Sequence, residues 1–221
     1  MIMKTSITYL SVALLMLLLP VATWAQSANY TLDESSTIVI KGTSTIHDWE
    51  ADVEKMDANV MLATSQPEGE EPNNLVESFS ITIPVESLES GKGNMNRKMY
   101  DALKKDDHPE IMFFLKSAPL VDKAAGGQSF TATLVDSSLT TTKEERGLKA
   151  TGNLNIAGSL KEITFPVKAT KINNNSFRFE GSYSLNMKEY DVDPPSAVFG
   201  TIKSGEEVTI EFNILVNKAG Q

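Results

Sequence analysis

The chain contains no cysteine and only two histidines among its 221 residues. The absence of cysteine excludes disulfide bonds, thiol nucleophiles, zinc sites built on cysteine and iron–sulfur clusters. An exported protein without disulfides depends on its hydrophobic core for stability. A domain of about 200 residues is large enough to build such a core.

Basic residues are also few, because 20 Lys and Arg face 29 Asp and Glu and leave a formal net charge of −9. Nucleic-acid binding requires clustered Lys and Arg to neutralise phosphates. The charge therefore argues against a nucleic-acid partner, so none is expected, and it also argues against docking on anionic lipid surfaces. At about 150 residues per domain, the length favours one domain.

Long apolar runs are absent after the first residues. The run Ile7–Leu19 follows Lys4, and small residues occupy positions −3 and −1 before a cleavage point after Ala25. This is the organisation of a secretory signal peptide, and the run is shorter than the roughly 20 residues of a membrane span. We expect a signal peptide over 1–25, one domain over 26–221, and a periplasmic or secreted protein with no stable membrane span.

Most of the remaining chain alternates apolar and polar residues with a period of two, which predicts strands with one dry face. Short polar turns such as Ala157–Gly158 separate these segments, so neighbouring strands are expected to be antiparallel. The alternating apolar sets begin at Phe79, Leu148, Ile163, Phe177 and Val208.

One segment has helical spacing instead. Met95, Met99 and Leu103 recur at intervals of four, and Pro109 prevents continuation. We predict one short α-helix near 94–105 within an all-β fold, an antiparallel barrel of about eight strands. A barrel of this size is either filled by side chains or holds one small ligand, and the periodicity leaves both open.

The stretch "TSTIHDWEAD" places His47, Asp48 and Trp49 side by side. A catalytic relay lacks its serine elbow, and neighbouring strand residues point to opposite faces. A metal site has only His108 and a carboxylate such as Asp107 as possible partners. The favoured interpretation is structural: His47 and Trp49, which combine an apolar body with a polar tip, line the rim of a barrel.

Four stretches together resemble the YceI-like family of exported bacterial proteins, a resemblance that covers nearly the whole mature chain. They are "YTLDESSTIVIKGTSTIHDWEADV", "IPVESLESGKGNMNRKMYDALKKDDHPEIMF", "ATGNLNIAGSLKEITFPV" and "YDVDPPSAVFGTIKSGEEVTIEF". The chain departs from many members in the helix, where Asn96–Tyr100 replaces an Arg-Asp-x-His-Leu run. It therefore resembles a divergent branch.

The resemblance implies a lipocalin-like barrel with an apolar interior that holds a polyisoprenoid chain, an isoprenoid quinone tail or another lipid. It implies a non-enzymatic binder with no cofactor, no catalytic residue and no metal, and a homodimer is possible. The apolar sets of the strands and the helix then give the expected ligand-binding residues: Phe79, Ile81, Ile83, Met99, Leu103, Phe113, Phe165, Phe179, Tyr183 and Phe212. His47, Trp49 and Tyr100 are expected at the cavity mouth.

Two other functions remain open at this stage. A structural or interaction protein of the cell envelope with a solid barrel predicts no cavity larger than a few waters. A metal-dependent or hydrolytic enzyme would have to use His47 and His108.

Overall fold

The computed structural model describes residues 27–63, 75–121, 144–197 and 202–220. The expected signal peptide and its cleavage point therefore lie outside the described residues. The elements are β1 (Ser27–Leu32), β2 (Thr37–Ser44), β3 (Trp49–Val53), β4 (Asp57–Ala63), β5 (Val76–Pro84), the 3₁₀ helix η1 (Val85–Ser87), β6 (Leu88–Glu89), α2 (Gly93–Ala102), β7 (Glu110–Ser117), β8 (Glu144–Ile156), β9 (Ser159–Asn173), β10 (Ser176–Asn186), the 3₁₀ helix η2 (Met187–Tyr190), β11 (Ser196–Ala197) and β12 (Ile202–Lys218). No helix in these ranges is long and apolar enough to cross a membrane.

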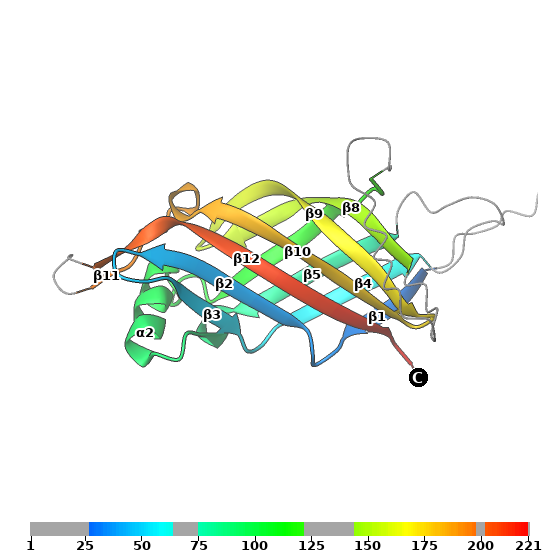
Figure 1. The fold of residues 1–221 in the computed structure, drawn as a ribbon, viewed down its shortest axis with the longest axis horizontal. Coiled ribbons are helices and arrows are strands. Elements are labelled where there is room, and N and C mark those ends of the chain that lie inside the picture. Colours follow the sequence, from blue (N-terminus) through cyan, green and yellow to red (C-terminus); the bar gives the residue numbers. More distant parts are fainter. Residues whose placement is uncertain (1–26, 64–74, 122–143, 198–201, 221) are drawn as a thin grey trace, which may run out of the picture.

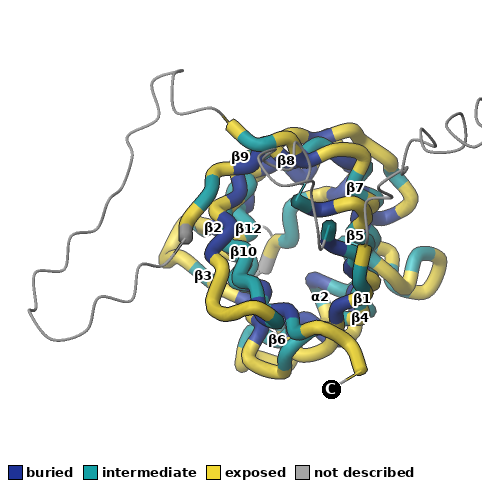
Figure 2. Tube along the Cα trace, turned by 90° about the vertical axis from the view of Figure 1, so that its right-hand side faces the viewer, coloured by how far each residue is buried: buried dark blue, intermediate teal, exposed yellow. Residues whose placement is uncertain are grey.

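Eight antiparallel strands close into a barrel in the order β1-β4-β5-β7-β8-β9-β10-β12, and β12 pairs back onto β1. Figure 2 shows these strands as a ring seen end-on. The prediction of an all-β antiparallel barrel of about eight strands is confirmed. Every neighbouring pair in this order is antiparallel, and two-residue turns join β8 to β9 and β9 to β10.

The barrel has two different ends, which Figure 1 shows at left and right. At one end, β12 pairs with β1 near Lys218; toward the other, it pairs with β2 from Asn213 to Ser204. β3 and β6 continue the sheet beyond β2, and α2 lies beside them. We call the end with α2 and β11 the helix end, and the end with the start of β1 and the finish of β12 the terminal end.

The break between β1 and β2 is held by hydrogen bonds to β12. The backbone N–H of Asp33 donates to the carbonyl of Leu215 at 2.8 Å. The Ser36 hydroxyl donates to the same carbonyl and accepts from the N–H of Leu215, both at 3.0 Å. A polar side chain thus satisfies the backbone where the ladder is interrupted.

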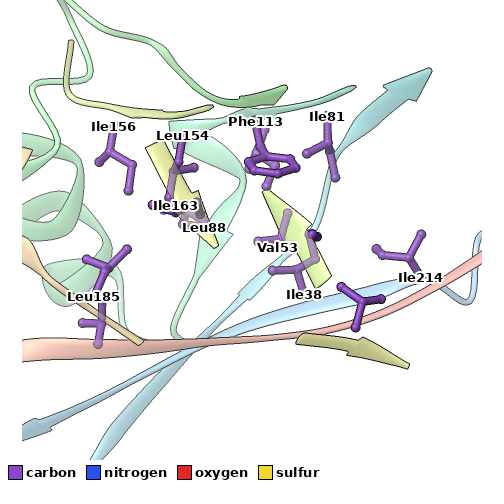
Figure 3. Packing of buried hydrophobic residues seen from close by; sticks show 14 of the residues in the cluster. Ile38, Val53, Ile81, Leu88, Phe113, Leu154, Ile156, Ile163, Leu185 and Ile214 are labelled. Carbon is purple, nitrogen blue, oxygen red and sulfur yellow. The ribbon is translucent and has the colours of Figure 1, made fainter. Parts of the chain in front are cut away.

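The predicted period-two pattern corresponds to strands with one buried face. In β8, Leu148, Ala150 and Leu154 are buried, whereas their outward neighbours are not. Figure 3 shows Ile81 and Phe113 from one side of the barrel directed toward the same interior as Ile38 and Ile214 from the other. The hairpin predicted at Ala157–Gly158 is present, with both residues at positive φ (50° and 82°), as a two-residue type I′ turn requires.

The helix is shorter than predicted. It runs over Gly93–Ala102 rather than 94–105, because Lys104 adopts the left-handed conformation at φ 55°. The N–H of Lys105 then donates to Tyr100 O, and that of Lys104 donates to Asp101 O. This is a Schellman ending, which usually uses glycine and so has no signal in this sequence.

Candidate functional site

The barrel encloses two adjoining cavities. The outer cavity, of about 630 Å³, lies at the helix end and is lined by α2, β2, β12 and the turns around them. The inner cavity, of about 160 Å³, lies toward the terminal end. Four isoleucines line both cavities, so the two cavities adjoin there. We call this shared boundary the waist; it consists of Ile38, Ile83, Ile111 and Ile210.

A cluster of aromatic rings lies in the wall of the inner cavity. Phe165, on β9, is the hub: its ring centroid lies 5.6 Å from Phe113, 5.8 Å from Tyr183 and 5.7 Å from Phe212. Phe79 extends the cluster through Phe113 at 6.3 Å. Tilted and edge-to-face pairs at these separations are favourable beyond simple burial. The remaining lining is aliphatic apart from Phe179, so none of the described residues that line the inner cavity has a charged side chain.

Two strand glycines make room for these rings. A Cβ on Gly152 would lie 2.4 Å from the ring of Phe113 and 2.5 Å from the carbonyl oxygen of Phe114. A Cβ on Gly181 would lie 2.6 Å from the ring of Phe212. The glycines interrupt the apolar alternation because a neighbouring ring occupies their side-chain space.

The outer cavity is wider and more varied. Aliphatic and methionine side chains cover its walls, including Met95, Met99 and Leu103 of α2. Polar residues occur as well, among them Ser44, His47, Asn94 and Lys98. Ile46 also lines it although 61% of its surface is exposed, so the cavity reaches the protein surface beside the β2–β3 turn.

That turn contains His47 and Asp48, the neighbours considered above as a catalytic pair. Ser44 holds it, because its hydroxyl donates to the carbonyl of His47 at 2.7 Å. His47 is exposed, and its Nδ1 lies 2.9 Å from the carbonyl of its neighbour Asp48. The Asp48 carboxylate is exposed and does not line either cavity. The pair is therefore not arranged as a carboxylate–imidazole relay.

Trp49 forms part of the wall of the outer cavity. Its indole Nε1 donates to the carbonyl of Thr43 at 3.0 Å, and its ring lies over Gly42, where a Cβ would be only 2.3 Å from the ring. The indole thus covers the bare backbone of β2 while its polar atom is satisfied. A buried or half-buried tryptophan needs such a partner.

Twelve of the thirteen predicted site residues line a cavity. Phe79, Ile81, Ile83, Phe113, Phe165, Phe179, Tyr183 and Phe212 line the inner cavity, and His47, Ile83, Trp49, Met99 and Leu103 line the outer one. That these residues contact a ligand stays a prediction.

Tyr100 is the exception, since it lines neither cavity. Its hydroxyl lies 2.8 Å from the carbonyl of Leu88 and 3.0 Å from that of Glu86, so it ties α2 to η1 and β6. Tyr100 follows Met99 directly, and adjacent helical residues point about 100° apart, so the two side chains leave α2 in different directions.

Tyr190 is a cavity residue that the sequence did not reveal. It closes η2, lines the outer cavity and is 1% exposed. Its hydroxyl neighbours that of Tyr183, but the two atoms do not meet the geometry of a hydrogen bond. Burial, followed by the charge of the neighbouring Tyr183, raises the pKa of the Tyr190 phenol well above its usual range.

The residues expected for an enzyme do not meet. His108 packs against the β8–β9 turn, since a Cβ on Gly158 would lie 2.6 Å from its ring. The structure shows no group of three His, Asp or Glu side chains within the described ranges that could hold a metal ion. His47 and His108 therefore offer no metal-ligating group in this part of the chain.

The family comparison covers most of the chain. A model described as a YceI-like domain matches residues 30–216. A search among curated proteins finds no match.

Solved structures of related shape span nearly the same region. The crystal structure of BcnA from Burkholderia cenocepacia has a TM-score of 0.59 at 19% identity and covers 83% of this chain and 98% of its own. A polyisoprenoid binding domain from Saccharophagus degradans has a TM-score of 0.58 at 13% identity, with 86% and 98% covered. The YceI protein of Campylobacter jejuni has a TM-score of 0.56 at 12% identity, with 80% and 88% covered. At such identities the likeness concerns the fold.

Proposed function

The chain belongs to the family of YceI-like domains, and from that premise we propose that it is an exported, non-enzymatic carrier of a long apolar molecule. The ligand class is a polyisoprenoid, an isoprenoid quinone or another lipid chain. The observation that carries the proposal is the pair of adjoining cavities, whose shared waist consists of four isoleucines. The Saccharophagus degradans relative, described as a polyisoprenoid binding domain, supports the same class of ligand.

The cavities suit an extended hydrocarbon in size and chemistry. Ligand pockets in proteins commonly measure about 300–1,000 Å³ and are mostly apolar. Burial contributes about 0.8 kcal/mol per CH₂, so about 15 buried carbons contribute about 12 kcal/mol before costs. Ordering the chain subtracts several kcal/mol. Such a pocket selects length and girth more strongly than chemical identity.

The solid-barrel alternative predicts no cavity larger than a few waters, and the outer cavity of about 630 Å³ exceeds that many times. The enzymatic alternative has no supporting geometry around His47 or His108. The proposal includes export through a signal peptide over residues 1–25, which gives the protein access to envelope lipids.

The direct test is to extract freshly purified protein with organic solvent and to identify what it releases, alongside native mass spectrometry. We expect a bound lipid and a rise in melting temperature when isoprenoids are added to delipidated protein. Protein that carries no lipid and gains no stability from isoprenoids or other lipid chains contradicts the carrier proposal.

A blocking substitution sharpens this test. Ile210 lines both cavities, so Ile210→Trp fills the waist and is expected to abolish most of the lipid retention. The matched control is Leu160→Trp, which adds the same ring to an outward side chain that is 57% exposed. Equal lipid retention by both folded variants would show that the waist is not the binding route.

A further inference from the structure

The outer cavity has a charge of one sign, unlike the chain as a whole. Among the described residues that line it, Lys92 and Lys98 carry positive charge and no carboxylate is present. The whole chain nevertheless has a formal net charge of −9. The rim therefore has a charge opposite to that of the molecule that surrounds it.

Both lysines have hydrogen-bonding capacity to spare. Lys98, on α2, is half-buried and donates one hydrogen bond to the backbone carbonyl of Ser196 on β11, which leaves two N–H groups of its ammonium. Lys92 is exposed at the start of α2. Neither forms an ion pair with a described residue.

The acidic residues that lie close to these lysines in the sequence do not line the cavity, including Asp101, three residues after Lys98 on α2. The Glu89 carboxylate accepts from the N–H of Gly91 at 2.7 Å, and its pKa is lowered by hydrogen bonds from Asn96 and Gly91. Asp48 and Glu50 are exposed beside His47 and Trp49 and do not line the cavity. His47, Asn94 and Ser204 add polar groups of no fixed charge to the same lining.

We propose that Lys92 and Lys98 bind an anionic headgroup, a phosphate or carboxylate, on the apolar chain that fills the barrel. The inference rests on the proposed carrier function and narrows its ligand to an anionic amphiphile. The chain lies against the isoleucine waist and the aromatic inner cavity, and the headgroup lies at the rim beside α2. Charge-assisted hydrogen bonds from ammonium to such oxygens are stronger than neutral ones.

The test compares three probes with one chain and different headgroups: geranylgeranyl phosphate, geranylgeranoic acid and geranylgeraniol. Each is titrated into delipidated full-chain protein by calorimetry at low and at high salt. We expect the phosphate, the carboxylate or both to bind about 10-fold more tightly than the alcohol, which corresponds to about 1.4 kcal/mol. The preference should shrink as salt rises because the rim is partly exposed.

The variant Lys92→Gln/Lys98→Gln should lose the preference while its affinity for geranylgeraniol stays unchanged. Lys161→Gln is the matched control, because Lys161 is exposed on β9 and lines neither cavity. Lys98→Arg should retain the preference, since it keeps the charge.

The outcomes separate the two proposals. Equal affinity for all three probes, or a preference that survives the double substitution, overturns the headgroup inference and leaves the carrier function standing, with a neutral headgroup. If none of the three binds while another lipid does, the headgroup inference also fails. Absence of binding by any lipid chain overturns the carrier function itself. If the double variant fails to fold, the single exposed substitution Lys92→Gln decides, because half of the preference should be lost.

Discussion

The two cavities of this barrel are built on different principles. The inner one is enclosed by aromatic rings on β5, β7, β9, β10 and β12 that contact one another at 5.6–6.3 Å. The outer one has walls of Ile, Leu and Met, a tryptophan and a polar rim at the surface. Rings in mutual contact give a space of fixed shape, whereas methionine and leucine adapt to varied shapes. This difference suits an inner cavity that binds the end of the ligand's apolar chain rigidly and an outer cavity that adapts to the ligand as it enters.

The largest effect is expected at the centre of the rigid region. Phe165→Ala removes the ring that contacts Phe113, Tyr183 and Phe212 and should lower the free energy of unfolding by about 3 kcal/mol. Phe114→Ala is the control, because that ring is 47% exposed, and it should cost about 0.5 kcal/mol. Urea unfolding of both variants measures the two losses in the free energy of unfolding. Similar losses would mean that contacts within the aromatic cluster do not stabilise the fold.

The next largest effect is expected at glycines that differ in the room they have for a side chain. Gly152→Ala places a methyl group against Phe113 and the backbone of Phe114 and should cost about 2 kcal/mol. At the outer cavity, Gly93→Ala meets nothing within 4 Å and should leave the stability unchanged or slightly raised. Thermal melts of the two variants measure this difference. A tolerant Gly152 would show that the inner wall yields as easily as the entrance.

Two tyrosines near α2 and η2 should respond in opposite ways. Tyr100→Phe loses a hydrogen bond to a backbone carbonyl and should destabilise the fold by about 1 kcal/mol. Tyr190→Phe removes a buried hydroxyl whose contact with the Tyr183 hydroxyl lacks hydrogen-bond geometry, so the stability should stay the same or rise. Denaturant unfolding of the ligand-free variants tests this order, and the reverse order would mean that Tyr190 has a partner in solution.

The smallest effect is a pH dependence at the terminal end. Hydrogen bonds from the Ser35 side chain, the Ser35 backbone and Asn217 lower the pKa of Asp33 below 3.8. Ionised Asp33 therefore stabilises the fold above pH 3.8, and this contribution is lost as the pH falls through the lower folded-state pKa.

Replacing Asp33 by Asn should slightly lower the melting temperature at neutral pH, and the difference from the parent should vanish in strong acid. Its exposed neighbour Glu34, replaced by Gln, is the control. A difference that persists unchanged at about pH 2 would show that the carboxylate charge is not the cause.

Much of the inner cavity could be predicted from the sequence, because strand parity decides which residues face inward. Once Phe79, Ile81 and Ile83 are assigned to one strand face, their common direction follows from the pleat. Phe165, Tyr183 and Phe212 reach the same cavity by the same rule in other strands. The pattern could not show that Phe165 contacts three other rings, because that depends on how strands pair across the barrel.

The outer cavity was less predictable, because turns and helix ends build much of it. Lys104 ends α2 in a left-handed conformation that a lysine does not signal in the sequence. The hydrogen bond from Tyr100 to the carbonyl of Leu88 likewise depends on how α2 packs against β6. Tyr190 and Lys98 reach the cavity from η2 and α2, where no period of two applies.

The sequence by itself determined the class of fold and the apolar sets of its strands, because alternation is a local property that every compatible fold must respect. Only the tertiary structure decided that the closed barrel is hollow, that its two cavities meet at the waist of isoleucines, and that Lys92 and Lys98 lie at one rim. Those features depend on the spacing between strands distant in sequence, and no local pattern encodes the volume that remains between them.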